Sequence, residues 1–323
     1  MDALPAADGA ALAEHVKKSE SAEAGIQDDI PDINDGTDDD VNNNEQYLPF
    51  RSVRDFFARV NACTEETFLI VSPVSAAEYE AVSKSRERRG LKFRMDFWDG
   101  VELWVTVHAS GVHEVLHRYL DDNIRDRIVL MGLGNNWKAV GSTTFNANRS
   151  GSEGDSSRKP PSQRRFPTAW PTLVIEGGYS QSMRKLRHKA RWWLKTSNFE
   201  VKIVLLAKFL PISKTILVEK WVGAPAQASL PASLPNVTTR ARQQLLNAQA
   251  LVPSQVQAIT IKPLPGVNPR QTPSPNSFQV VRSPLVLEFS LLFLRQPGPG
   301  EGDVFLGSQL FQNFAAAVWE EVE

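Results

Sequence analysis

The sequence lacks the features that mark several classes of protein. Cys63 is the one cysteine among 323 residues, which excludes a disulfide framework and a cysteine-based zinc site. It has no run of 18 apolar residues, the length that a membrane-spanning helix needs. Its N-terminal segment has no basic stretch followed by an apolar one, as a secretory signal would. We therefore expect an intracellular protein, nuclear or cytoplasmic and not secreted, with no membrane partner.

Charge is distributed unevenly along the chain. Residues 1–46 contain 13 acidic residues and two lysines, a net charge of −11, whereas the remainder has 34 basic and 24 acidic residues, a net charge of +10. A block of like charge without apolar periodicity is typical of a disordered tail. A basic body favours a polyanionic partner. The charge pattern therefore predicts a disordered tail over 1–46 and nucleic acid as the partner.

Hydrophobic periodicity predicts both helices and strands before residue 110. Ser52 precedes an apolar period of 3.6 residues and is a suitable N-cap, and Gly90 is a suitable helix end. Asp99-Gly100 lies between two alternating, aromatic-rich runs, which predicts a hairpin with a type I′ turn. The elements that we expect are a helix over 52–62, a strand over 68–74, a helix over 75–90 and a hairpin over 92–107.

A second series of elements is expected between residues 110 and 209. In order, we expect a helix over 110–133, a strand over 137–145, a loop over 146–154, a short hairpin strand, a strand over 172–176, a helix after Ser180 and a strand over 201–208. Ser110 is a suitable N-cap for the first helix. The helix after Ser180 connects the apolar strands over 172–176 and 201–208. It is therefore expected to be a crossover helix, and these two strands are expected to be parallel. The order indicates an α/β protein with a mixed sheet.

Composition predicts where the folded domain is interrupted. Residues 223–282 are rich in Pro, Ala, Ser and Gln, which is typical of a low-complexity insertion. An apolar strand is expected over 283–295 and a closing helix over 305–322. We therefore expect an acidic tail over 1–46 and a single α/β domain formed by 47–222 and 283–323.

Two acidic residues are the candidate catalytic groups. The chain has neither a Walker loop nor a Gly-x-Ser-x-Gly elbow, so it carries no signature of nucleotide binding or serine hydrolysis. Glu176 ends an apolar strand, where a carboxylate is costly unless a metal or a cation meets it. Asp155 lies one short hairpin upstream, and carboxylate pairs bind Mg²⁺. The plainer interpretations are a solvated loop acid at Asp155 and a strand-end Glu paired with Arg or Lys.

The helix after Ser180 is strongly basic. Residues 158–195 contain ten lysines and arginines and a single acid. The positions that line one face at three- and four-residue spacing are Arg184, Arg187, Arg191 and Lys195, with Lys185 and Lys189 alongside, and the expected core stripe is Met183, Leu186, Ala190 and Trp193. Such a face is suited to neutralising phosphates, or else it is a solvated helix surface. Of Trp192 and Trp193, one should belong to the core.

The sequence resembles the PD-(D/E)XK, restriction-endonuclease-like nuclease superfamily. The resemblance rests on four segments together with the basic helix. The segments are Gly-Ser-Thr-Thr-Phe at 141–145, Gly-Asp-Ser-Ser-Arg-Lys-Pro at 154–160, Trp-Pro-Thr-Leu-Val-Ile-Glu at 170–176 and Val-Lys-Ile-Val-Leu-Leu-Ala-Lys-Phe at 201–209. It covers residues 110–210 best, and a group of fungal proteins has a similar Pro-Thr-Leu-Val-x-Glu and Trp-Trp signature. The resemblance implies an α-β-β-β-α-β core flanked by helices and a Mg²⁺-dependent nuclease that hydrolyses phosphodiester bonds in DNA, with Mn²⁺ as the alternative ion.

The resemblance also implies roles for individual residues. Asp155 matches the acid of the Pro-Asp half-motif and Glu176 the acid of Glu-x-Lys, so both would bind metal. Glu114 occupies the place of an additional acid on the first core helix. The sequence departs from the pattern at the lysine, where Gly178 stands, and the resemblance then implies a cation from the next helix, either Lys185 or Lys189.

Two functions remain open on the sequence. The first is the DNA-cutting enzyme described above. The second is a catalytically inactive domain of the same fold that binds nucleic acid or a protein partner, because the lysine of Glu-x-Lys helps to orient and deprotonate the attacking water. His113 and Glu114 open the first core helix, and read alone they would be surface residues. The sequence indicates no oligomeric state.

Overall fold

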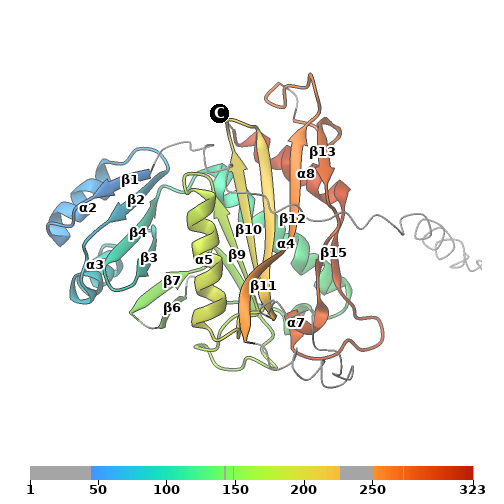
Figure 1. Ribbon diagram of the computed structural model, residues 1–323, viewed down its shortest axis with the longest axis horizontal. Helices are drawn as coiled ribbons and strands as arrows, with labels where there is room; N and C mark the ends of the chain where they lie inside the picture. The colour runs from blue at the N-terminus through green and yellow to red at the C-terminus, as the bar shows by residue number, and fades with distance from the viewer. Residues whose placement is uncertain (1–44, 142, 148, 226–249, 272, 323) are drawn as a thin grey trace, which may run out of the picture. The chain divides into compact units, whose positions relative to one another are not determined.

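The computed structural model describes residues 45–322 apart from residues 142, 148, 226–249 and 272. The described residues belong to one compact unit. They form two mixed sheets, one two-stranded antiparallel sheet and six α-helices (Figure 1). No helix in this part of the chain is long and apolar enough to cross a membrane. The expected mixed α/β fold is confirmed at this level.

The first sheet has six strands, most of them from the N-terminal part of the described chain. In spatial order the strands are β1 (Glu45–Leu48), β2 (Thr67–Val71), β4 (Glu102–Val107), β3 (Arg94–Trp98), β7 (Ser150–Glu153) and β6 (Thr144–Ala147). β1 is parallel to β2, and the other neighbours are antiparallel. Helices α2 (Val53–Ala62) and α3 (Ala76–Arg89) share one apolar core with β2, β3 and β4.

The predicted helix cap, helix end and hairpin turn of this region are confirmed. The Ser52 hydroxyl accepts a hydrogen bond from the backbone N–H of Asp55 at 3.1 Å, so it is the N-cap of α2. Gly90 ends α3 with φ 62°, a left-handed conformation that glycine adopts at little cost. Asp99 and Gly100 both have positive φ, 53° and 73°, as the turn between β3 and β4 requires.

The second sheet has seven strands. In spatial order they are β13 (Phe278–Val281), β12 (Leu251–Pro263), β11 (Thr215–Pro225), β10 (Ile203–Leu210), β9 (Leu173–Gly178), β8 (Ser156–Lys159) and β5 (Lys138–Ala139). β9 and β10 are parallel, and the other neighbours are antiparallel. Helix α5 (Met183–Thr196) connects β9 to β10, so the predicted crossover and parallel pair are confirmed.

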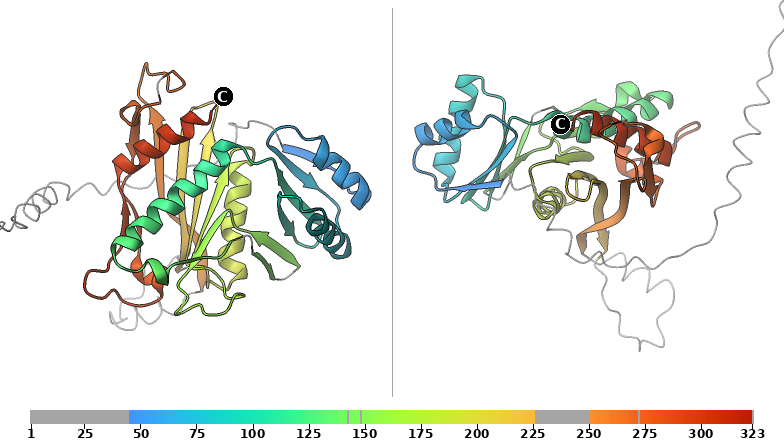
Figure 2. Two further views of the ribbon diagram at one scale, coloured as in Figure 1. Left: turned by 180° about the vertical axis from the view of Figure 1, so that it is seen from behind. Right: turned by 90° about the horizontal axis from the view of Figure 1, so that it is seen from above.

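Helices cover both faces of the second sheet (Figures 1 and 2). α5 packs on the face that includes Val174 and Leu206. Ile175 and Leu205 face the other way, into a core shared with helices α4 (Gly111–Leu130), α7 (Phe289–Phe293) and α8 (Ser308–Glu320). Successive side chains of a strand alternate between faces, so Glu176 follows Val174 onto the α5 side. The short antiparallel pair β14 (Leu285–Leu287) and β15 (Val304–Leu306) completes the described fold.

The expected strand over 137–145 and the loop after it are wrong in detail. The chain divides there between the two sheets, with β5 in the second and β6 in the first. Gly141, with φ 70°, lies at the division, where glycine permits a sharp change of direction. Residues 146–154 are not a loop, because β6 and β7 pair across them as a hairpin. Arg149 at φ 65° lies at the turn.

Part of the expected low-complexity insertion is ordered β-structure. β12 pairs with β11 from Ile216↔Ile261 to Pro225↔Leu251, and β13 pairs with β12. Most β12 side chains are exposed or half-buried, so its composition resembles that of a loop although its backbone is paired. The central part of the expected insertion, residues 226–249, lies outside the described residues.

Two further expectations differ from the structure. The apolar run 283–295 is not one strand: it forms β14, and then the short helix α7 begins after Glu288. Periodicity cannot distinguish strand from helix in so short an apolar run. The expected disordered tail over 1–46 lies almost entirely outside the described residues. At its end, Glu45 already belongs to β1 and is paired with Phe68 in β2.

Candidate functional site: a buried acidic cluster between two sheets

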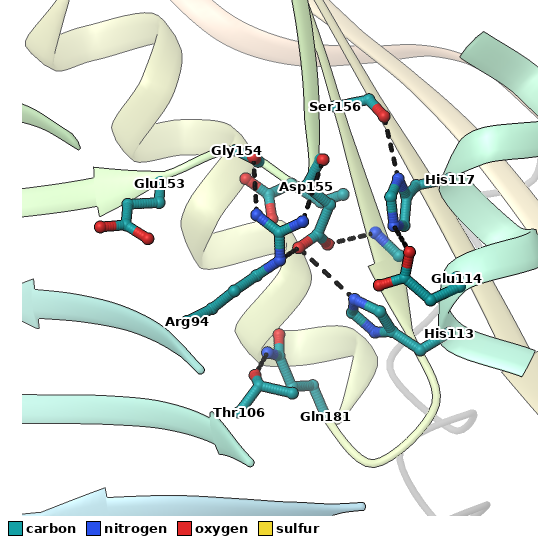
Figure 3. Close-up of polar contacts among 12 residues, drawn as sticks. Arg94, Thr106, His113, Glu114, His117, Glu153, Gly154, Asp155, Ser156 and Gln181 are labelled. Carbon is teal, nitrogen blue, oxygen red and sulfur yellow. Dashed lines mark hydrogen bonds and ion pairs between the residues drawn. The ribbon is translucent and has the colours of Figure 1, made fainter. Parts of the chain in front are cut away.

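The candidate acids meet at the N-terminal end of β8 and the C-terminal half of β9. Asp155 comes directly before β8, and Glu176 lies within β9. The first sheet contributes Arg94 and Asp96 from β3, and α5 contributes Lys189. Helix α4 approaches from the other side of the second sheet, as Figure 3 shows. The structure therefore brings residues from both sheets and both flanking helices into one polar cluster.

Asp155 is buried and held by several donors. Its Oδ2 accepts a hydrogen bond from the Gly177 N–H at 2.8 Å. Its Oδ1 lies 2.7 Å from Arg94 Nε and 3.5 Å from His113 Nε2. Burial alone would raise the pKa of this carboxyl, but Arg94 and His113 outweigh it and hold the pKa well below its usual range. Asp155 is therefore an anion fixed in place, and the solvated-loop interpretation is wrong.

Glu176 is fully buried, with 0% relative exposure. Its Oε2 accepts from Lys189 Nζ at 2.8 Å and its Oε1 from Trp193 Nε1 at 2.7 Å. Burial raises the pKa of Glu176 to about 7, and Lys189 only partly offsets this effect. Burial also opposes the charge of Lys189, but Asp96 and Glu176 outweigh it, so the pKa of Lys189 is raised. The interpretation of Glu176 as an acid paired with a lysine therefore describes this structure, although β9 continues to Gly178 and Glu176 is not its last residue.

The two glycines after Glu176 explain why the cation comes from a helix. A Cβ on Gly178 would lie 2.4 Å from Leu186 Cδ1, so α5 occupies the space that a side chain at this position would need. A Cβ on Gly177 would lie 3.1 Å from the carbonyl oxygen of His113, so this glycine allows β9 to approach α4 closely. The glycines thus bring both helices against the strand.

The two lysines proposed as the missing cation have different surroundings. Lys189 lies between Glu176 and Asp96, with Nζ–oxygen distances of 2.8 and 3.0 Å. Lys185 instead contacts Glu45 at 2.8 Å and Tyr47 at 3.2 Å. The structure therefore places Lys189, and not Lys185, against the candidate acids.

The basic face of α5 is only partly open to solvent. Arg184, Arg191 and Lys195 are exposed, whereas Arg187 donates to Glu219 at 2.8 Å. Arg191 lies 5.1 Å from the centre of the Trp221 ring. The expected core stripe of the helix is confirmed, since Met183, Leu186, Ala190 and Trp193 are all buried. Trp193 is thus the core tryptophan of the pair, and its indole also contacts Glu176.

Sequence reasoning missed the histidines of α4. His113 is buried, so its interpretation as a surface residue is wrong, and Glu114 is half-buried. His113, Glu114 and His117 lie with their ligand atoms within 4.8 Å of one another. The signal was present in the sequence, because residues 113–117 read His-Glu-Val-Leu-His, a His-Glu-x-x-His spacing that places both imidazoles on one side of a helix. Nearby, Glu114 is an anion whose pKa is lowered to about 2 by His117 and Arg118.

Asp155 and Glu176 fit a shared Mg²⁺ ion poorly in this arrangement. Magnesium takes six oxygen ligands, usually one or two carboxylates with several waters. Both carboxylates of this pair are buried, and three of their four oxygens already accept hydrogen bonds from protein donors. Asp155 Oδ1 makes no hydrogen bond within the described chain, but Arg94 lies against it. The donor set nearer to α4 contains imidazole, which suits transition metals better than magnesium.

Comparison with known proteins assigns no family: no protein-family model matches the chain, and no curated protein sequence matches it.

Proposed function

We propose that this chain is a metal-dependent phosphodiesterase of the PD-(D/E)XK type that acts on nucleic acid, with DNA as the expected substrate. The observation that carries the proposal is the contact between Lys189 and Glu176, 2.8 Å apart. It supplies, from the helix after the acidic strand, the cation that is missing at Gly178. Asp155 is hydrogen-bonded to the residue that follows Glu176, so all three side chains surround one stretch of β9.

The order of elements supports the same proposal. With β6 and β7 set aside, because they belong to the first sheet, the elements α4, β5, β8, β9, α5 and β10 are a helix, three antiparallel strands, a crossover helix and a parallel strand. The two helices lie on opposite faces of the sheet. This order agrees with the α-β-β-β-α-β core that the sequence resemblance implies. Glu114 is on the first of these helices, where an additional acid is expected.

Lys189 would act by charge and not as a base. The raised pKa of its ammonium keeps it protonated at neutral pH, so it cannot remove a proton from water. A fixed cation of this kind stabilises negative charge that develops on a phosphate. The exposed Arg184, Arg191 and Lys195 on the same helix would neutralise neighbouring phosphates of the substrate. The Asp155 and Glu176 carboxylates do not fit a shared magnesium ion, so no step of the proposed hydrolysis involves magnesium at this pair.

A second function is favoured by one observation, the burial of the cluster. Glu176 and Lys189 are almost inaccessible to solvent, and both carboxylate oxygens of Glu176 already have protein donors. Buried charge pairs of this kind also occur where no reaction takes place. The alternative is a catalytically inactive domain of the same architecture that binds nucleic acid or a protein partner.

A cleavage assay separates the two functions. The full chain is incubated with single-stranded DNA, duplex DNA and RNA, each with Mg²⁺, Mn²⁺ or Zn²⁺, and products are resolved by electrophoresis. The hydrolase proposal expects cleavage with at least one ion and loss of cleavage in Glu114→Gln, which changes a half-buried acid and should fold. The matched control is Glu87→Gln on α3, which lies outside the cluster. Absence of cleavage under every condition, together with a mobility shift on the same DNA, would establish the inactive alternative.

A further inference from the structure

We infer that His113, Glu114 and His117 form a binding site for a transition-metal ion of the zinc class, beside the Asp155 carboxylate, which lies 3.5 Å from His113 Nε2. The three residues occupy positions i, i+1 and i+4 on the first turns of α4, within ligand-to-ligand reach of 4.8 Å. The three residues lie on the α4 side of the second sheet, whereas Lys189 and Glu176 lie on its α5 side. The inference therefore does not depend on whether the chain cuts nucleic acid.

Two buried nitrogens at this place have no hydrogen-bond partner among the described residues. The Nε2 atoms of His113 and His117 are both inaccessible to solvent, and neither makes a hydrogen bond to any residue that the structure describes. Their nearest carboxylate oxygens, from Asp155 and Glu114, lie 3.5 and 3.6 Å away. These contacts are longer than hydrogen bonds, and a buried polar atom without a hydrogen bond costs about 1–3 kcal/mol. Two such atoms side by side indicate a ligand that both can contact.

The hydrogen bond on the other side of His117 sets its ring for coordination. His117 Nδ1 lies 2.9 Å from the Ser156 hydroxyl (Figure 3). With the proton on Nδ1 and donated to Ser156, Nε2 keeps its lone pair. Histidine ligands of metals are commonly held in this way by a partner on the second ring nitrogen. Ser156 follows Asp155 in the chain, so the strand that carries the acid also orients the imidazole.

The distances suit a small four-coordinate ion. Ligand atoms about 2.0–2.2 Å from a tetrahedral zinc lie about 3.4 Å from one another. The separations of 3.5 Å between His113 Nε2 and Asp155 Oδ1, and of 3.6 Å between His117 Nε2 and Glu114 Oε2, are close to that value. Asp155 Oδ1 lacks a hydrogen bond within the described chain, but it forms an ion pair with Arg94 Nε at 2.7 Å. These two separations are thus near the spacing that an ion would impose, and the three ligand atoms of His113, Glu114 and His117 all lie within 4.8 Å of one another.

The nitrogen and oxygen donors of this site favour a transition-metal ion over magnesium. Two imidazole nitrogens with carboxylate oxygens suit Zn²⁺, Fe²⁺, Co²⁺ and Ni²⁺, whereas magnesium prefers oxygen ligands and water. Both histidine side chains have 2% relative exposure, but that of Glu114 is 34% exposed. An ion would therefore be enclosed on the histidine side and reached by solvent at Glu114. The site is described as a binding site, without a reaction assigned to it.

Metal analysis of the full chain tests the inference. The protein is stripped with a chelator, reloaded with Zn²⁺, passed over a desalting column and analysed by mass spectrometry for bound metal. We expect about one ion per chain, and Mg²⁺ in large excess should not displace it. X-ray absorption of the zinc-loaded chain should show nitrogen and oxygen neighbours that include two imidazoles. A spectrum without imidazole, or no retained zinc, would overturn the inference.

Variants locate the ion. The double variant His113→Gln/His117→Gln should lose stoichiometric zinc, and Glu114→Gln should weaken binding by at least about tenfold. Glu114→Gln also serves where the double variant does not fold. The control is His108→Asn, an exposed histidine at φ 51°, where Asn tolerates the backbone conformation. Zinc affinity that is unchanged in Glu114→Gln, or lost equally in His108→Asn, would place the ion elsewhere and contradict the site.

Discussion

Lys189 and Asp96 form a buried ion pair that joins the two sheets. Lys189 comes from the helix that crosses between β9 and β10, and Asp96 from β3 of the other sheet, with Nζ 3.0 Å from Oδ2. The same ammonium contacts Glu176 at 2.8 Å, while Ser152 donates to the second oxygen of Asp96 at 2.6 Å. One lysine therefore neutralises acids from both sheets, so its loss should affect folding as well as any chemistry.

The first prediction concerns that lysine. Lys189→Met keeps the volume but leaves two buried acids without their cation, so we expect the free energy of unfolding to fall by roughly 3–5 kcal/mol. Urea denaturation followed by circular dichroism measures the loss. The control, Lys92→Met, makes the same change at an exposed position and should stay within about 0.5 kcal/mol of wild type. Equal stability of the two variants would show that the buried cluster does not depend on Lys189.

The second prediction concerns the glycine at the position of the missing lysine. Because a Cβ on Gly178 would lie 2.4 Å from Leu186, we expect Gly178→Ala to destabilise the fold by about 1–3 kcal/mol through overpacking. Combining it with Leu186→Ala should cost less than the sum of the two single changes, because each residue then has room. A double-mutant cycle in urea measures this coupling. Strict additivity would contradict the proposed contact between β9 and α5.

The sequence predicted the part of the site that depends on local pattern. The apolar strand that contains Glu176 and the crossover helix after it were both visible in the spacing of hydrophobic residues, although the strand runs two residues further than expected, to Gly178. The resemblance implied a cation from that helix, and a crossover helix packs on the face of the strand that precedes it. Lys185 and Lys189 could not be distinguished, because they are four residues apart and so lie on the same side of the helix.

The remainder of the site depends on contacts between distant segments. Arg94 contacts Asp155, and Asp96 contacts Lys189, and both come from β3 of the other sheet. No local pattern in the sequence of β3 predicts these two contacts. His113 and His117 were not predicted as site residues for a different reason. Their spacing is visible in the sequence, but His113 lies beside the apolar stripe of its helix and not within it, so hydrophobic periodicity does not predict its burial. Its burial comes from the close approach of β9 at Gly177 to the backbone of α4 and from the contact of its ring with Asp155.

The third prediction is the pH dependence that Glu176 contributes to stability. Burial raises the pKa of Glu176 from an ordinary value near 4.5 to about 7. Between these two values the folded chain keeps a proton that the unfolded chain has lost. The contribution is therefore fully present below pH 4.5 and is lost as pH rises to about 7, an effect on the order of 3 kcal/mol.

Comparison with Glu176→Gln isolates that contribution, because the amide does not titrate. The unfolding free energy of wild type minus that of the variant should fall between about pH 4.5 and pH 7 and then level off. Denaturant titrations at several pH values in one ionic strength measure the difference. A difference that rises with pH across this window would mean that Lys189 outweighs burial and that Glu176 ionises more readily in the folded chain.

The last prediction concerns nucleic-acid binding by α5. Arg184 and Arg191 are exposed, whereas Arg187 donates to the buried carboxylate of Glu219 at 2.8 Å. If the exposed pair neutralises two phosphates, Arg184→Gln/Arg191→Gln should reduce the slope of log affinity against log salt by about 2 on duplex DNA, with little change in sequence preference. Gln has similar helix propensity and the core stripe is untouched, so the fold should be retained.

Arg187→Gln provides the contrast on the same helix. It removes the partner of Glu219, so we expect lower stability with a salt slope close to that of wild type, because this arginine is already engaged within the protein. Binding is measured by fluorescence anisotropy at several salt concentrations, and folding by thermal denaturation. If the double variant bound DNA with the salt dependence of wild type, the exposed arginines would be solvated surface residues and the phosphate-binding role of α5 would have to be abandoned.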